Sequence, residues 1–213
     1  MDGGPRRTDR RPPRPMMGAR RWLASAAFVL GLTLGAVGPA AAATIGGPFS
    51  LLDQDGRLRT EADFRGQFVL LYFGYTYCPD LCPTTLLKIA AAIDQLAAEA
   101  PAAAERVVPV LITVDPQRDT PEVLRAYSAH LHPRLVALTG SAEALAAVGR
   151  AYGVFAAPVL TGDSAAYLTD HTSFVYLLGP DGAYLQHFEA DVTVEGLLAA
   201  LRRHLLPPEQ RTG

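Results

Sequence analysis

Methionine is absent from nearly the whole chain. The only three methionines of this 213-residue sequence are Met1, Met16 and Met17. Thioether sulfur is a soft ligand that selects soft metal ions. A metal carrier built on methionine ligands is therefore excluded for everything that follows the N-terminal segment.

Cysteine is almost as scarce, because the chain holds only Cys78 and Cys82. A disulfide between them would close a very short loop, and such a loop stabilises a fold little. The two thiols therefore indicate chemistry rather than a structural crosslink.

Acidic residues outnumber basic residues outside the N-terminal segment. Residues 1–43 contain seven Arg and two Asp, so a net charge of −2 for the whole chain leaves −7 for residues 44–213. An acidic domain without a basic patch is a poor binder of nucleic acid, and we expect no such partner. The sequence shows no internal repeat and no interdomain linker, and its 49% apolar content predicts one domain with a sizeable core at residues 44–213.

Residues 1–43 have the layout of an export segment. Arg20 and Arg21 precede an uncharged stretch whose most apolar part is 22–37, and an alanine run follows it. The uncharged residues 23–45 could also span a bilayer, which takes about 20 residues. We expect a cleaved signal or a retained anchor, with the domain on the extracytoplasmic side of the membrane. The residues before Met16 are expected to be a disordered lead-in, and Met16 or Met17 is an alternative start.

The chain alternates between strand and helix patterns. The apolar run 68–73 predicts a buried strand. Pro83, followed by apolar residues at helical spacing, predicts a helix that has Pro83 as its first residue and ends near residue 100. Further strands are expected at 107–114 and 135–138, further helices after the capping residues Thr120, Ser141 and Thr193, hairpins at 49–60 and 173–188, and a long irregular loop at 153–169. This order predicts an α/β fold with a mixed sheet, and a cysteine pair between a strand and a helix is the thioredoxin-like layout.

The position of the cysteines predicts how they behave. They lie near the expected N-terminus of a helix, whose positive field favours thiolate over thiol. Cys78 and Cys82 are four positions apart, so on one helical turn their side chains would point the same way. Such a pair could close a disulfide, or could hold one soft metal ion such as Cu(I), with Zn(II) a poorer fit.

One of the five histidines has the setting of a third ligand. His171 lies in Asp170-His171-Thr172, between the expected loop and the strand that begins near Ser173, and we expect this segment to return beside the cysteines. Asp170 could orient the imidazole or cap a turn. His130, His132, His187 and His204 are expected in structural positions at helix ends or on a hairpin strand.

Three motifs together resemble the Sco/SenC family. They are Tyr-Cys-Pro-Asp-Leu-Cys-Pro at 77–83, Val-Asp-Pro-Gln-Arg-Asp-Thr-Pro at 114–121 and Asp-His-Thr at 170–172. The resemblance extends from Phe49 to Leu206. It implies a thioredoxin-like fold in which Cys78, Cys82 and His171 bind one copper ion, as Cu(I) or Cu(II). By the same resemblance Asp119 supports the site, although its sequence context also suits a helix cap.

The resemblance implies a copper metallochaperone for the dinuclear copper centre of cytochrome c oxidase subunit II. Other expected partners are a thiol reductase and another copper chaperone, and we expect a monomer. The alternative is a thiol–disulfide oxidoreductase that reduces the cysteines of that subunit. Redox enzymes of this fold normally have a cis-proline before the strand that begins here at Ser173, whereas this chain has no proline between Asp170 and Pro180, which favours metal binding. A peroxidase is a weaker alternative, and a copper-sensing role stays open.

Overall fold

The fold is organised around strand β3 (Phe68–Gly74), in which every residue is buried. This computed structural model describes residues 45–160, 167–171, 173–189 and 191–210, and they belong to one compact unit, Ala41–Gly213. An unbroken apolar run suits a strand that is covered on both faces. The buried strand predicted at 68–73 is confirmed, with Gly74 as an additional residue.

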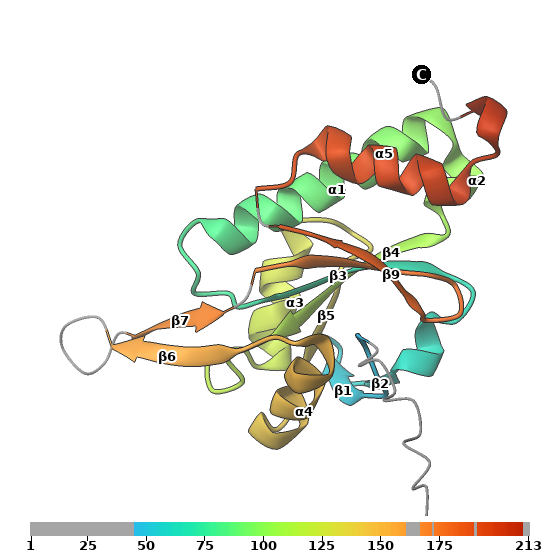
Figure 1. Cartoon of the computed structure of the whole chain (residues 1–213). Coiled ribbons are helices and arrows are strands. Elements are labelled where there is room, and N and C mark those ends of the chain that lie inside the picture. The colour runs from blue at the N-terminus through green and yellow to red at the C-terminus, as the bar shows by residue number, and fades with distance from the viewer. Residues whose placement is uncertain (1–44, 161–166, 172, 190, 211–213) are drawn as a thin grey trace, which may run out of the picture. The chain divides into compact units, whose positions relative to one another are not determined.

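β3 lies inside a seven-stranded mixed sheet with the order β2-β1-β5-β4-β3-β8-β9 (Figure 1). β3, β4 and β5 are parallel, whereas β8 pairs with β3 in the antiparallel sense. The hairpins β1–β2 and β8–β9 complete the sheet. The other strands are β1 (Ser50–Asp53), β2 (Leu58–Thr60), β4 (Val107–Thr113), β5 (Val136–Thr139), β8 (Val175–Leu178) and β9 (Tyr184–Phe188). The predicted α/β class with a mixed sheet, an N-terminal hairpin and a late hairpin is confirmed.

Helices cover both faces of this sheet. They are η1 (Glu61–Phe64), α1 (Leu81–Glu99), α2 (Pro101–Ala104), α3 (Pro121–Ala129), α4 (Ala142–Tyr152), α5 (Val194–Leu205) and η2 (Pro208–Gln210). Successive side chains of a strand point to opposite faces. Leu70 and Tyr72 therefore pack in one core with α1, α3 and α5, whereas Leu71 and Phe73 pack in another with η1 and α4. Figure 1 shows α1 and α5 on one side of the sheet and α4 on the other.

Three helices begin at the predicted capping residues. The hydroxyl oxygens of Thr120, Ser141 and Thr193 each accept a hydrogen bond from the amide three residues later. These bonds satisfy amides that have no partner inside the helix. Gly153 ends α4 with a positive φ of 68°, a conformation that glycine adopts without a steric penalty.

The cysteine helix begins earlier than predicted. α1 starts at Leu81, so that Cys82 is its second residue and Pro83 its third. Proline is tolerated throughout the first turn because the amides there have no partner inside the helix. The prediction of Pro83 as the first helical residue is therefore wrong, and Cys82 is part of the helix.

The long loop predicted at 153–169 is also wrong. This region contains β6 (Ala156–Leu160) and β7 (Tyr167–His171), which pair antiparallel in a two-stranded sheet of their own. Pro158 lies within β6, opposite Thr169. Proline is accepted in edge strands, and both strands of a two-stranded sheet are edges.

The predicted export signal or anchor at 1–43 lies outside the described residues, and the domain boundary after it stays a prediction. Among the helices of the described part, α1 is apolar and long enough to cross a bilayer, with 19 residues. Its apolar residues Leu86, Ile89 and Ile93 pack into the core between the helix and the sheet. We therefore interpret α1 as a core helix of the domain.

Candidate metal centre

The two cysteines meet where β3 passes into α1. Cys78 lies in the connecting loop and is half-buried, whereas Cys82 in the first turn of α1 is fully buried. No disulfide joins the two sulfurs. The backbone amide of Cys82 donates a hydrogen bond to the Cys78 sulfur, with 3.3 Å between N and Sγ. The Cys78 sulfur therefore accepts a hydrogen bond from one of the amides at the start of the helix that have no partner inside the helix.

Residues of β3 close the inner side of this pair. The Tyr72 hydroxyl donates to the Cys82 sulfur at an Oη–Sγ distance of 3.6 Å. A Cβ atom placed on Gly74 would lie 2.7 Å from Cε1 of Tyr72 and 3.0 Å from Sγ of Cys82. Only glycine leaves room for the sulfur and the ring at this point, because such contacts are shorter than van der Waals separation.

Burial decides the protonation of Cys82. Desolvation, followed by the hydrogen bond with Cys78, raises the pKa of the Cys82 thiol to about 12. Burial in a medium of low polarity disfavours the charged form of an acid. The prediction that the positive helix end favours a thiolate is therefore wrong for Cys82, which is a neutral thiol near pH 7.

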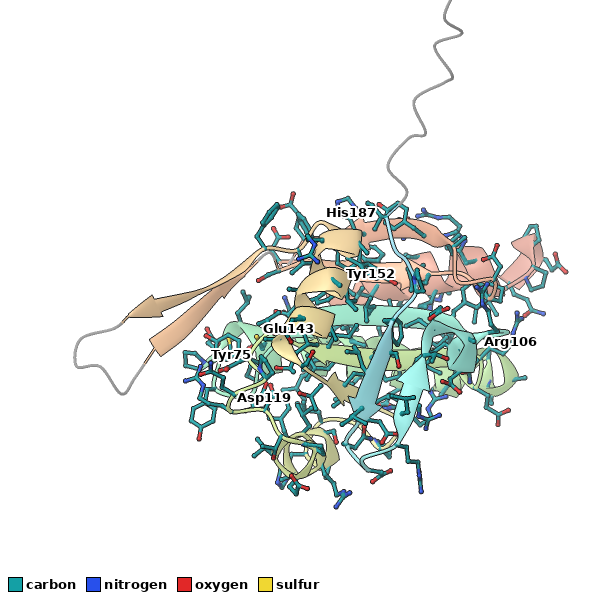
Figure 2. All side chains as sticks on the ribbon, turned by 90° about the horizontal axis from the view of Figure 1, so that it is seen from below. Tyr75, Arg106, Asp119, Glu143, Tyr152 and His187 are labelled. Carbon is teal, nitrogen blue, oxygen red and sulfur yellow. The ribbon has the colours of Figure 1, made fainter. Side chains whose placement is uncertain are left out.

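Asp119 joins the cysteine loop to the end of β4. This carboxylate is fully buried, and it accepts hydrogen bonds from the Thr76 amide at 3.1 Å, the Thr76 hydroxyl at 2.5 Å and the Thr113 hydroxyl at 2.5 Å. Figure 2 shows Asp119 at the same end of the domain as Tyr75, with Arg106 at the opposite end. Thr120, not Asp119, caps α3. The Asp119 carboxylate therefore does not cap the helix but holds the segment that precedes Cys78.

A buried hydroxyl without a partner faces the same region. Tyr127 of α3 packs against the core cluster that contains Cys82, and its Oη has no hydrogen-bond partner among the described residues. Burial raises the pKa of Tyr127, and negative charge on Cys82, Cys78 or Asp119 would raise it further. A buried donor of this kind calls for a specific explanation.

The structure describes only the backbone of the third predicted ligand. His171 is the last residue of β7, opposite Ala156, and Asp170 lies opposite Ala157. The side chains of 156–171 lie outside those described, so the ligand role of His171 and the supporting role of Asp170 stay predictions. Among the described side chains, no three His, Cys, Asp or Glu residues are grouped closely enough to hold a metal ion. The structure thus brings together Cys78 and Cys82, and ties Asp119 to their loop.

Two of the remaining histidines have partners within the fold. His132 is buried, and its Nδ1 accepts a hydrogen bond from the Arg134 amide at 3.1 Å. The Nδ1 of His187 lies 2.6 Å from the Tyr184 hydroxyl. Both contacts are local to a turn or a hairpin, which agrees with a structural role.

Sequence reasoning missed four residues around the site: Tyr72, Thr76, Thr113 and Arg118. Three of them are polar residues at the ends of β3 and β4 or in the loops that follow. Parallel strands place their carboxyl ends at one edge of a sheet, where α/β proteins build their sites. This topology could have drawn attention to Thr76 and Thr113, and Arg118 lies inside one of the three motifs.

The comparisons with known proteins agree with this geometry. The SCO1/SenC family model matches residues 37–206. The chain belongs to the SCO1/SenC family. Among curated SCO relatives, the mitochondrial SCO2 homolog of Bos taurus is 45% identical over 159 residues, covering 75% of this chain and 59% of the relative. The SCO2-like protein of Rickettsia prowazekii is 41% identical over 155 residues, covering 72% of this chain and 74% of the relative. The chain thus spans about 60% of the length of the mitochondrial SCO2 relatives.

Solved structures of the SCO1/SenC family share the fold. Copper-bound ScoI of Arabidopsis thaliana is 39% identical, with a TM-score of 0.71, and the match covers 75% of this chain and 97% of that one. Copper-bound ScoI of Bradyrhizobium japonicum is 38% identical, with a TM-score of 0.68 and coverage of 76% and 99%. The predicted thioredoxin-like fold and the predicted family are both confirmed.

Proposed function

We propose that this SCO1/SenC protein is a copper metallochaperone that holds one copper ion between Cys78, Cys82 and His171. The observation that carries the proposal is the pair of reduced cysteines at the β3–α1 junction, linked by the contact between the Cys82 amide and the Cys78 sulfur. Solved relatives that are 38–39% identical contain copper, which supports copper as the cargo.

The donor set fits copper by its chemistry. Two cysteine sulfurs are soft ligands that suit Cu(I), and an imidazole nitrogen from His171 would complete a three-coordinate site that also accepts Cu(II). Since the Cys82 thiol is protonated near pH 7, loading with copper must release its proton. Tyr72 is placed to donate a hydrogen bond to the resulting thiolate.

The asymmetry of the two thiols suits the transfer of copper. Cys82 is fully buried and held between Tyr72 and Gly74, whereas Cys78 is half-exposed at the surface of the domain. An incoming ligand can therefore approach the metal beside Cys78 while Cys82 keeps hold of it. We propose the dinuclear copper centre of cytochrome c oxidase subunit II as the acceptor, on the extracytoplasmic side of the membrane. A thiol reductase would keep the pair reduced, and another copper chaperone would supply the ion.

A second candidate is a thiol–disulfide oxidoreductase that reduces the cysteines of the same subunit. The half-exposed Cys78 next to a buried Cys82 favours it, because an accessible attacking thiol and a protected resolving thiol suit exchange. The absence of a proline from the sequence between Asp170 and Pro180 speaks against it. The two functions use the same pair of thiols in different states.

Copper stoichiometry tests the proposal. The reduced protein is loaded anaerobically with Cu(I) and desalted, and copper per chain is measured beside His171→Ala and Cys82→Ser. His130→Ala, an exposed histidine at the end of α3, is the matched control. We expect about one copper per chain in the wild type and the control, and a clear loss in the other two variants. Full binding by His171→Ala would exclude His171 as a ligand, and no copper in the wild type would favour the oxidoreductase.

A further inference from the structure

Arg118 lies next to Asp119 in the chain but contacts different residues of the cysteine loop. Its guanidinium carbon is 4.7 Å from the ring centroid of Tyr77 and 5.7 Å from that of Tyr75. A cation within about 6 Å of a ring centroid is attracted by the negative face of the ring. Tyr75 is 3% exposed and Tyr77 is 60% exposed, so the same guanidinium contacts one buried ring and one ring at the surface of the cysteine loop.

A buried carboxylate holds Arg118 in this position. Nε of Arg118 forms an ion pair with Oδ2 of Asp115, whose side chain is only 2% exposed. The Asp115 amide in turn donates to the Thr113 hydroxyl at 3.0 Å, and the Arg118 amide donates to the Asp115 carbonyl at 3.3 Å. The orientation of the guanidinium is therefore fixed by the end of β4 and not only by the tyrosine rings.

Two consecutive residues of the β4–α3 loop hold three consecutive residues of the cysteine loop. Arg118 contacts Tyr75 and Tyr77, while Asp119 binds Thr76 between them. The next residue after this segment is Cys78, whose sulfur lies 3.3 Å from the Cys82 amide. The position of the sulfur thus depends on a segment in which three consecutive residues contact the β4–α3 loop.

We propose that Arg118 is a positioning residue of the copper site, which holds Tyr75 and Tyr77 so that the Cys78 sulfur stays at the start of α1. The part of this inference that concerns copper rests on the proposed function. The part that concerns the distance between the two thiols does not. The contacts that link Arg118 to the cysteine loop are those with the rings of Tyr75 and Tyr77.

The chemistry of the guanidinium explains why arginine is suited to this position. Its planar group can lie over aromatic rings and at the same time donate to a carboxylate, whereas a lysine ammonium is a compact, strongly hydrated point charge. Arg118→Lys keeps the charge opposite Asp115 but removes the flat surface over the rings. The variant therefore separates the ion pair from the contact with the tyrosines.

Four variants test the inference: Arg118→Lys, Tyr77→Leu, the two combined, and Arg125→Lys as the matched control. Arg125 lies on α3 and forms an exposed ion pair with Asp55. Tyr77 is largely exposed, so Tyr77→Leu is expected to fold even if a change at Arg118 disturbs the loop.

The first measurement needs no copper. The Cys78–Cys82 pair is equilibrated with glutathione: two thiols give up two electrons and two protons, one S–S bond forms, and glutathione disulfide becomes two glutathione thiols. The second measurement is Cu(I) affinity, by competition with a chromophoric Cu(I) chelator. The free energy of a cation–π contact corresponds to a change of about threefold to tenfold in the equilibrium constant of the glutathione exchange or of Cu(I) binding.

We expect Arg118→Lys and Tyr77→Leu each to disfavour the intramolecular disulfide and to weaken Cu(I) binding by about threefold to tenfold. The double variant should be no worse than the stronger single variant, because the contact between Arg118 and Tyr77 is already lost in each single variant. Arg125→Lys should match the wild type. Wild-type values in both single variants, or fully additive effects in the double variant, would overturn the inference. If the wild type binds no copper, the proposed function fails, and the glutathione equilibrium still tests the positioning role.

Discussion

Asp53 at the end of β1 and Asp119 in the β4–α3 loop are both buried, and their carboxylates are held in opposite ways. Asp53 accepts hydrogen bonds from the amides of Asp55 and Arg57 and from Nε of Arg59, all at 2.9 Å. Asp119 accepts from neutral donors, the hydroxyls of Thr76 and Thr113 and the Thr76 amide. Burial raises the pKa of both, but the Arg59 guanidinium and the two amides bring the pKa of Asp53 below its usual value. The pKa of Asp119 stays above it.

The two carboxylates also differ in which parts of the chain they connect. The partners of Asp53 lie within six residues, so it stabilises one turn. Asp119 instead links segments 43 residues apart, and burial works against its negative charge. A carboxylate whose pKa is raised by burial is more often found at a functional site than one whose pKa is lowered by local donors. We infer that Asp53 serves the stability of the domain and that Asp119 serves the geometry around Cys78.

The largest expected effect on stability is at the turn. Asp53→Ala leaves the Arg59 guanidinium and two amides without their acceptor, and we expect it to lower the free energy of unfolding by about 3 kcal/mol. Urea denaturation measures this change. Asp55→Ala in the same turn, whose ion pairs are exposed, should cost less than about 1 kcal/mol. Cu(I) affinity should be unchanged in both variants, and a weakened affinity in Asp53→Ala would contradict the separation of roles.

The converse result is expected at Asp119. Asp119→Ala removes the acceptor of the Thr76 and Thr113 hydroxyls, which should lower the free energy of unfolding by about 2 kcal/mol. Its main effect should be on copper, because groups that orient metal ligands typically contribute about 10-fold to 100-fold in affinity. Competition with a Cu(I) chelator measures it, with Asp53→Ala as the control. Equal affinity in the two variants would remove the distinction.

Most of the fold could be predicted because its signals are local. The apolar run of β3 and the capping residues Thr120, Ser141 and Thr193 each act within a few neighbouring residues. The β6–β7 hairpin could not, because Pro158 reads as a break in a strand and is tolerated only since both strands are edges. Tertiary context decided that case.

The site divides in the same way. The spacing of Cys78 and Cys82 is visible in the sequence, and so is their place between a strand and a helix. The neutral state of Cys82 could not be predicted, because it depends on how deeply Tyr72 and Gly74 enclose the sulfur. The partners of Asp119 could not be predicted either, because Thr76 and Thr113 reach it only when the ends of β3 and β4 lie side by side.

The smallest effect expected from the comparison is a pair of opposite pH dependences of the free energy of unfolding. The folded pKa of Asp53 is lowered, so the stability that it contributes is present above about pH 4 and is lost as the pH falls through that folded pKa. The folded pKa of Asp119 is raised, so its protonated form favours folding, and stability is lost as the pH rises from about 4 through that folded pKa.

Asparagine variants isolate the two contributions, and free energies of unfolding between about pH 3 and about pH 7 measure them. As the pH rises, the stability of the wild type relative to Asp53→Asn should increase, whereas that relative to Asp119→Asn should decrease. Asparagine fits at Asp119 without a lost bond, because its amide nitrogen can donate to the Thr76 hydroxyl while its oxygen accepts from the Thr76 amide and the Thr113 hydroxyl. Of the two aspartates, Asp53 is the one that forms an ion pair with a guanidinium, that of Arg59. If stability changed with pH in the same direction for both aspartates, this ion pair would not explain the difference between them.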